Sequence, residues 1–155
     1  MCGIAGVMTK NGTAPVSDVL DRMQAALLHR GPDGNARHEH GDTVILQTRL
    51  AIIDLETGDQ PFVLQGDRGP TALVANGEIF NYQELYSALP GIAFATASDC
   101  EVPLHLYSRD GTGYAEALRG MYAVAIHDAP NGRLVLTRDP FGIKPLYYVE
   151  TGTAF

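Results

Sequence analysis

The sequence predicts an α+β fold in a single domain. Two apolar runs, MYAVAIHD and RLVLTRD, flank Asn131-Gly132, and this pattern is the signal of a β-hairpin. Helical segments are inserted between groups of strands, which favours local antiparallel pairing over a doubly wound parallel sheet. A chain of 155 residues has room for one sizeable core and not for two.

The elements follow in order from the apolar pattern. A first strand is predicted over 2–9, and helical spacing of apolar residues predicts a helix over 15–29 that Gly31-Pro32 ends. Further strands are predicted over 43–53, 71–79, the two arms of the hairpin within 120–139, and the short run LYYV (146–149). Helices near 82–89 and 99–108 each open on a capping-box pattern, Asn81-x-x-Glu84 and Ser98-x-x-Glu101.

The composition excludes several classes of partner. The net charge is −7, whereas nucleic acids and anionic membrane surfaces need a basic face. No stretch approaches the roughly 18 apolar residues of a membrane span, and no secretory leader pattern opens the chain. We therefore expect a cytoplasmic protein without nucleic-acid or membrane partners, in which Cys2 and Cys100 are unpaired.

Cys2 directly follows the initiator Met1. Removal of Met1 would leave a thiol and a free α-amine on one residue. An N-terminal α-amine holds its proton less tightly than a lysine does, so it can take the thiol proton and later return it to a leaving group. A lone cysteine is more often a small buried apolar residue, so the rest of the chain has to decide.

Four polar stretches interrupt otherwise apolar segments. They are HRGPDG (29–34), QTRLAIIDL (47–55), ANGEIFNYQEL (75–85) and ASDCEV (97–102). Each has a simple structural explanation, namely a helix stop, a strand arginine paired with a carboxylate, a turn, and an acidic residue at a helix start. Singly, none of them establishes a function.

Together and in this order, the motifs carry a resemblance. MCGIAGV, RGPDG, RLAIIDL, Gln60-Pro61, NGEIFNYQEL, SDCEV, LRGMYAVAIHD and TRDPFGIKPLYY resemble the glutaminase domain of glutamine-dependent asparagine synthetases, a class II (N-terminal nucleophile) glutamine amidotransferase. The resemblance runs from Met1 to about Tyr148, and NGEIFNYQEL favours this branch over the phosphoribosyl-pyrophosphate amidotransferase and glucosamine-6-phosphate synthase branches. It implies a four-layer α/β/β/α sandwich with antiparallel sheets and hydrolysis of L-glutamine to L-glutamate and ammonia through a thioester.

The resemblance also implies roles for individual residues. Cys2 would be the nucleophile, the Asn76 side chain and the Gly77 N–H would bind the oxyanion, and Arg49 would pair with the substrate α-carboxylate. The substrate ammonium would be held by Asp99 and Glu78, the backbone of Leu50, Ala51, Ile52 and Ile53 would line the pocket, and Arg30 and Asp33 would brace the site as an ion pair. This set suits a zwitterionic substrate, which needs one fixed cation and one fixed anion.

The resemblance further implies what the domain does without and what lies beyond it. No metal or organic cofactor is expected in this domain, and His38-x-His40 is interpreted as an exposed pair and Cys100 as buried and unreactive. ATP and Mg are expected only in a synthetase domain or subunit, whose SGG-x-DS loop is not found among residues 1–155. The family continues with further strands, so the glutaminase domain is expected to be incomplete at its C-terminus, with edge strands open to pairing as a homodimer.

Two other functions remain open from the sequence. One is a non-catalytic docking or regulatory module with the same fold. The other is an amidotransferase half that delivers ammonia to a different acceptor, such as a sugar or a peptide.

Overall fold

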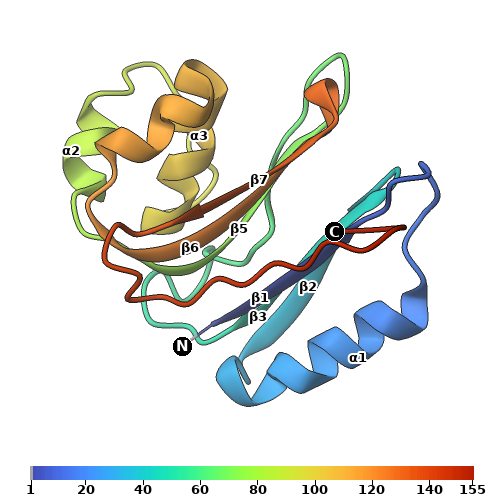
Figure 1. Cartoon of the computed structure of the whole chain (residues 1–155). Helices are drawn as coiled ribbons and strands as arrows, with labels where there is room; N and C mark the ends of the chain where they lie inside the picture. The colour runs from blue at the N-terminus through green and yellow to red at the C-terminus, as the bar shows by residue number, and fades with distance from the viewer. Residues whose placement is uncertain (1) are drawn as a thin grey trace.

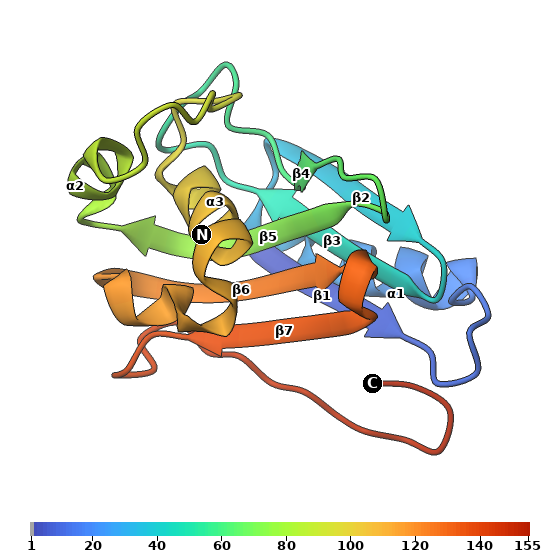
Figure 2. The same cartoon turned by 90° about the horizontal axis from the view of Figure 1, so that it is seen from above.

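The computed structural model describes residues 2–155, which form a four-layer α/β/β/α sandwich (Figures 1 and 2). The strands are β1 (Gly3–Met8), β2 (Gly34–His40), β3 (Thr43–Arg49), β4 (Phe62–Leu64), β5 (Thr71–Ile79), β6 (Gly120–Asp128) and β7 (Arg133–Arg138). The helices are α1 (Ser17–Leu27), α2 (Tyr82–Ser87) and α3 (Val102–Asp110), with 3-10 turns η1 (Leu28–Arg30), η2 (Asp99–Glu101), η3 (Gly111–Ala117) and η4 (Ala129–Asn131).

All strand pairs within the two sheets are antiparallel. One sheet has the order β1-β3-β2 and the other the order β4-β5-β6-β7. Figure 1 shows α1 on the outer face of the first sheet and α2 and α3 on the outer face of the second. The predicted α+β class and the layered arrangement are therefore confirmed.

Each outer layer is held by an apolar face. Leu20 of α1 is 2% exposed and packs against Val44 and Leu46 of β3. The larger core lies under α2 and α3, where Leu104 and Leu106 are among the fully buried side chains. Helices of 6 to 11 residues are marginal alone, so this packing stabilises them.

Apolar side chains of the central strands pack against one another between the two sheets. Ile45 of β3 packs against Ala72 and Val74 of β5 in this layer. Because side chains alternate along a strand, Gln47 and Asn76 lie two residues further along the same inner faces. The strands thus carry buried amides from the apolar layer to one end of the sandwich.

Two of the strand predictions are wrong. The strand predicted over 43–53 ends at Arg49, because the following segment turns back at Asp54, which has a φ of 52°. The short strand predicted at 146–149 is not formed: Tyr147 and Tyr148 are 89% and 80% exposed, and this part of the chain pairs with no strand of the described residues.

The segment beyond β7 instead returns to β1. Backbone hydrogen bonds join Met8 and Phe155 in both directions, at 3.2 and 2.9 Å, and the Lys10 N–H donates to the Thr153 carbonyl. Figure 2 shows this C-terminal segment running outside β7 on its way back. Its backbone hydrogen bonds to Met8 and Lys10 lie at the C-terminal end of the β1 edge.

The predicted capping boxes are also wrong in detail. Asn81 does not cap α2, because its side-chain amide bonds the Ala117 carbonyl and the Arg119 N–H instead. Ser98 does cap the next helical segment, accepting from the Cys100 N–H, whereas Glu101 turns away to accept from the backbone at 95–96.

Candidate active site

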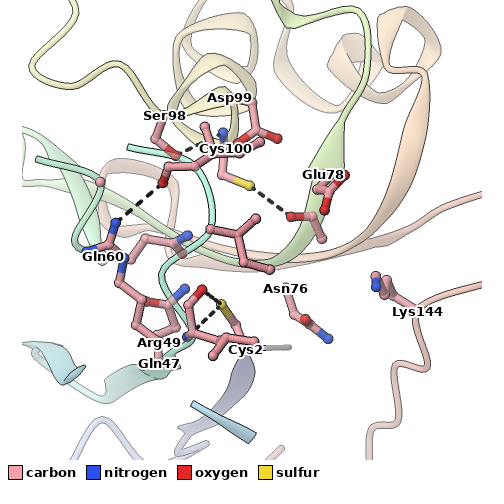
Figure 3. Close-up of a pocket in the computed structure, with 15 residues that line it drawn as sticks. Cys2, Gln47, Arg49, Gln60, Asn76, Glu78, Ser98, Asp99, Cys100 and Lys144 are labelled. Carbon is pink, nitrogen blue, oxygen red and sulfur yellow. Dashed lines mark hydrogen bonds between the residues drawn. The ribbon is translucent and has the colours of Figure 1, made fainter. Parts of the chain in front are cut away.

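A solvent-open pocket of about 530 Å³ lies at the end of the sandwich where β3 finishes with Arg49 and β5 carries Asn76 and Gly77 (Figure 3). Of the predicted site residues, those that line it are Cys2, Arg49, Leu50, Ile52, Ile53, Asn76, Gly77, Glu78 and Asp99. Figure 3 places Cys2 on one side and Ser98, Asp99 and Cys100 on the other. The fold thus gathers segments that are up to about a hundred residues apart in the sequence.

The Cys2 thiol is half-buried and held by backbone. Its Sγ lies 3.4 Å from the Leu50 nitrogen, which donates to it, and 3.6 Å from the Leu50 carbonyl, to which the thiol donates. The Arg30 Nε donates to the Cys2 carbonyl at 3.2 Å. These contacts fix the sulfur at the pocket wall. Met1, whose removal the sequence argument requires, lies outside the described residues.

Arg30 and Asp33 brace the site, but within residues 2–155 they do not form the predicted ion pair. Arg30 donates to the Cys2 carbonyl, and Asp33 accepts from the Ala51 N–H at 2.9 Å. Each of these two side chains makes its hydrogen bond to a backbone group beside the pocket and not to the other side chain. Arg30, Asp33 and Ala51 do not themselves line the pocket.

Arg49, the last residue of β3, projects a largely buried guanidinium into the wall. It pairs with Asp59 at 2.7 Å and also donates to the carbonyls of Ile53 and Asp54. Gly58 passes so close that a Cβ there would lie 2.9 Å from the Arg49 Nη2. The loop that follows β3, residues 50–59, therefore wraps around the Arg49 guanidinium at one side of the pocket.

Asn76 and Gly77 lie on β5 beside the pocket, and a side chain at Gly77 is excluded. A Cβ at Gly77 would lie 2.1 Å from the Met121 carbonyl, so only glycine allows β5 and β6 to approach here. N–H and C=O groups of alternate residues face the same edge of a strand. Ile79, two residues on, donates to Asp99 across that edge, so the Gly77 N–H faces the same side as Asp99.

Asp99 supplies a buried carboxylate opposite Cys2. It is 3% exposed, and its Oδ2 accepts from the Ile79 N–H at 2.6 Å. Burial raises the pKa of Asp99, and the nearby Glu78 carboxylate raises it further, against the opposing effect of backbone hydrogen bonds. A bound ammonium group would relieve both unfavourable effects.

Sequence reasoning assigned no role to several residues of the pocket. Gln47, Gln60, Ser98 and Lys144 also line it. Asp54 ties its loop to the opposite wall, because its Oδ2 accepts from the Ala97 N–H at 2.8 Å. Gln60 was visible only as part of Gln60-Pro61, whose peptide bond is cis. By residue type alone, Gln47 in a strand and Asp54 in a turn are not marked as residues of a site.

Cys100 is buried, as predicted, and both cysteines are free thiols. Burial raises the pKa of the Cys100 thiol well above its ordinary value, with the Asp99 carboxylate adding to the effect. Its Sγ donates to the Gly77 carbonyl at 3.6 Å. Cys100 thus forms part of the pocket wall next to Gly77 of β5.

The interpretation of His38-x-His40 as an exposed pair is wrong for His38. Its ring is half-buried and lies 5.6 Å from that of His127, which is 2% exposed, while His40 is exposed. Within residues 2–155, no three His, Cys, Asp or Glu side chains are placed to hold a metal ion. In the same range, no helix has the length and apolar character needed to cross a bilayer.

Comparisons with known proteins agree with this geometry. The model of the glutamine amidotransferase domain matches residues 1–155. The chain belongs to the glutamine amidotransferase domain family. It is 41% identical to asparagine synthetase [glutamine-hydrolyzing] 2 of Bacillus subtilis, over 97% of this chain and 20% of that protein. It is 40% identical to asparagine synthetase [glutamine-hydrolyzing] of Triphysaria versicolor, over 95% of this chain and 25% of that protein.

A solved structure shares the fold. Glutamine phosphoribosylpyrophosphate amidotransferase from B. subtilis superposes with a TM-score of 0.78 at 22% identity, over 97% of this chain and 40% of that one. The domain therefore shares the fold of that amidotransferase. It spans about a fifth to a quarter of the length of the asparagine synthetases it matches.

Proposed function

We propose that this amidotransferase domain hydrolyses L-glutamine to L-glutamate and ammonia through a γ-glutamyl thioester on Cys2. The observation that carries the proposal is that one pocket gathers the Cys2 thiol, the Arg49 cation, the Asp99 anion and the donors at Asn76 and Gly77. A thiol needs only a base and an oxyanion site to open a carboxamide. The opposite charges select a free amino acid.

The chemistry balances without an added reagent. The sulfur attacks the carboxamide carbon, and the carbonyl electron pair moves to oxygen, where the Asn76 amide and the Gly77 N–H stabilise it. The α-amine of Cys2 carries the thiol proton to the departing nitrogen, and cleavage of the C–N bond releases ammonia. Water then attacks the thioester, the same amine takes the water proton and returns it to sulfur, and glutamate leaves.

We further propose that the ammonia serves asparagine synthesis from an aspartate activated by ATP. The two relatives named above are glutamine-hydrolysing asparagine synthetases, and each is four to five times longer than the region matched here. The acceptor chemistry, with ATP and Mg, would belong to a synthetase domain or subunit that acts as the partner of this domain.

The direct test follows labelled glutamine. We expect glutamate release by the wild type and none by Cys2→Ala, and hydroxylamine should trap the wild-type thioester as γ-glutamyl hydroxamate. Intact mass spectrometry checks that Met1 is absent from the active protein. Equal release by Cys2→Ala would remove Cys2 as the nucleophile. Glutamine binding without release by a wild type lacking Met1 would favour a non-catalytic module.

A further inference from the structure

The strand that carries the oxyanion donors loses its neighbour just before them. On one side, β5 pairs with β6 along its whole length, from Thr71 opposite Asp128 to Ile79 opposite Gly120. On the other side, β4 pairs only as far as Leu73, opposite Phe62. The peptide groups of the next residues on that edge therefore need other partners, since buried backbone groups are costly to leave unpaired.

Two glutamine side chains take the place of the missing strand at Ala75. The Gln60 Oε1 accepts from the Ala75 N–H at 2.6 Å, and the Gln47 Nε2 donates to the Ala75 carbonyl at 3.1 Å. Gln47 and Gln60 are 1% and 8% exposed, and Ala75 is 1% exposed. The backbone of one residue offers one N–H donor and one C=O acceptor, so the roles are fixed: Gln60 must accept and Gln47 must donate.

We call Gln47 and Gln60, with their two hydrogen bonds to Ala75, the clamp. The clamp lies directly beside the residues of the site. The Ala75 carbonyl belongs to the peptide plane that leads into Asn76, so holding that oxygen fixes the direction in which the Asn76 side chain leaves the strand. Gln47 projects from β3, two residues before Arg49, and β3 pairs with β1, the strand that Cys2 directly precedes. One side chain therefore spans from the sheet of the nucleophile to the strand of the oxyanion donors.

We propose that Gln47 and Gln60 are positioning residues that set the oxyanion donors Asn76 and Gly77 at their working distance from Cys2. The proposal rests on the glutaminase function proposed above. Neither glutamine is required to touch the substrate. Misplacing a preorganised donor by about 1 Å costs roughly a hundredfold in rate, whereas substrate held elsewhere by Arg49 and Asp99 keeps its affinity.

The test replaces each glutamine by leucine and by glutamate. Gln47→Leu and Gln60→Leu should lower kcat about tenfold to a hundredfold, with the Kd for glutamine changed less than about threefold. Alkylation of Cys2 by iodoacetamide, which forms no oxyanion, should keep its rate. The glutamate pair should diverge: Gln60→Glu keeps an acceptor and restores most of kcat, whereas Gln47→Glu has no donor when ionised and does not.

A matched control separates positioning from loss of stability. Val74→Ala removes packing from the same strand and the same inter-sheet layer without touching the clamp. It should lower the melting temperature while leaving kcat unchanged. If Val74→Ala lowers kcat as much as the leucine variants do, or if the two glutamate variants behave alike, the clamp is only structural and the proposal is overturned.

Amide exchange distinguishes a failed clamp from a failed function. Exchange at the Ala75 amide should quicken in Gln60→Leu relative to the wild type. If the wild type releases no glutamate, the glutaminase function fails and the positioning proposal fails with it. If the wild type is active and the leucine variants keep kcat, the positioning proposal alone is wrong.

Discussion

Arg49 is the residue on which we expect substrate selection to depend most. Its guanidinium is largely buried and already has Asp59 as a partner on the exposed side of the loop. In a Cys2→Ala background, Arg49→Ala should weaken glutamine binding roughly 100-fold, because the substrate carboxylate would enter the pocket without a counter-charge. Calorimetry measures this, and Arg49→Lys, which keeps the charge but loses the bidentate fork, should fall between.

A substrate analogue shows whether the lost affinity belongs to the carboxylate. 4-Aminobutanamide is glutamine without its α-carboxylate, so Arg49→Ala should change its binding little. Comparing the two ligands on the two proteins isolates the pair, as in a double-mutant cycle. Equal losses for both ligands would assign Arg49 to holding the loop carbonyls of Ile53 and Asp54 instead.

Asn76 makes the complementary prediction about rate. It is 5% exposed, on a strand that is otherwise apolar, where an amide needs partners. If its side chain stabilises the tetrahedral intermediate and not bound glutamine, Asn76→Ala should lower kcat about 10²–10³-fold with little change in Kd. Steady-state kinetics with calorimetry separates the two constants. A wild-type kcat in this variant would make Asn76 a residue of structure only.

Among the elements, the turn after β7 depends on one carboxylate. Asp139 accepts from the backbone N–H groups of Tyr122, Phe141, Ile143 and Lys144. Burial alone would raise the pKa of Asp139, but these hydrogen bonds outweigh it and lower the pKa. Asp139→Ala leaves several donors unpaired and should cost roughly 2–3 kcal/mol of stability in urea unfolding. Asp139→Asn keeps acceptor oxygen and should cost less; equal losses would contradict this account.

The elements also show what a sequence predicts well and what it does not. The strand over 71–79 and the hairpin around Asn131-Gly132 were predicted correctly, because dense apolar runs and a turn signal specify them locally. The helix predicted over 15–29 survives as Ser17–Leu27 with a 3-10 end. LYYV has the composition of a strand, but no strand among the described residues lies beside it to pair with. Local composition cannot show whether such a partner strand is present.

At the scale of the site, the sequence showed which residues meet but not what holds them. Motif order indicated Cys2, Arg49 and Asp99, and the fold brings all three to one pocket. The Arg30–Asp33 ion pair was wrong because both side chains found backbone partners whose positions depend on folding. Gln47 and Gln60 were missed because their partner, the Ala75 peptide, belongs to another strand.

The whole molecule is built from two sheets packed face to face, and residues from both sheets form the site at one end of their interface. Cys2 directly precedes β1 and Arg49 ends β3 in one sheet, whereas Asn76 and Gly77 lie on β5 in the other. The geometry of the proposed reaction would therefore depend on how the two sheets are held together. The histidines of β2 and β6 lie at the opposite end of the interface between the sheets. By strand geometry, the two ends of β3, Thr43 and Arg49, are about 20 Å apart.

That histidine end makes stability depend on pH. Burial and, to a smaller extent, the neighbouring His38 and His40 together lower the pKa of His127 to about 4, against the opposing charges of Asp42 and Asp128. The His38 pKa is lowered too, chiefly by burial. In the unfolded chain a histidine titrates near 6.5. The unfolded state therefore binds protons first as the pH falls, so stability is complete above about pH 6.5 and declines toward pH 4.

The decline should disappear when the buried imidazole is replaced. The His127 Nδ1 has no hydrogen-bond partner among the described residues, so His127→Leu removes a titrating group without stranding a polar partner on that nitrogen. Melting temperatures at pH 7, 6 and 5 should fall steadily in the wild type and much less in His127→Leu. His29→Gln alters an exposed histidine outside the cluster and should keep the wild-type slope. Parallel slopes for all three proteins would mean that the acid sensitivity lies elsewhere, in carboxylates such as Asp128, whose lowered pKa places its loss of stability at more acidic pH.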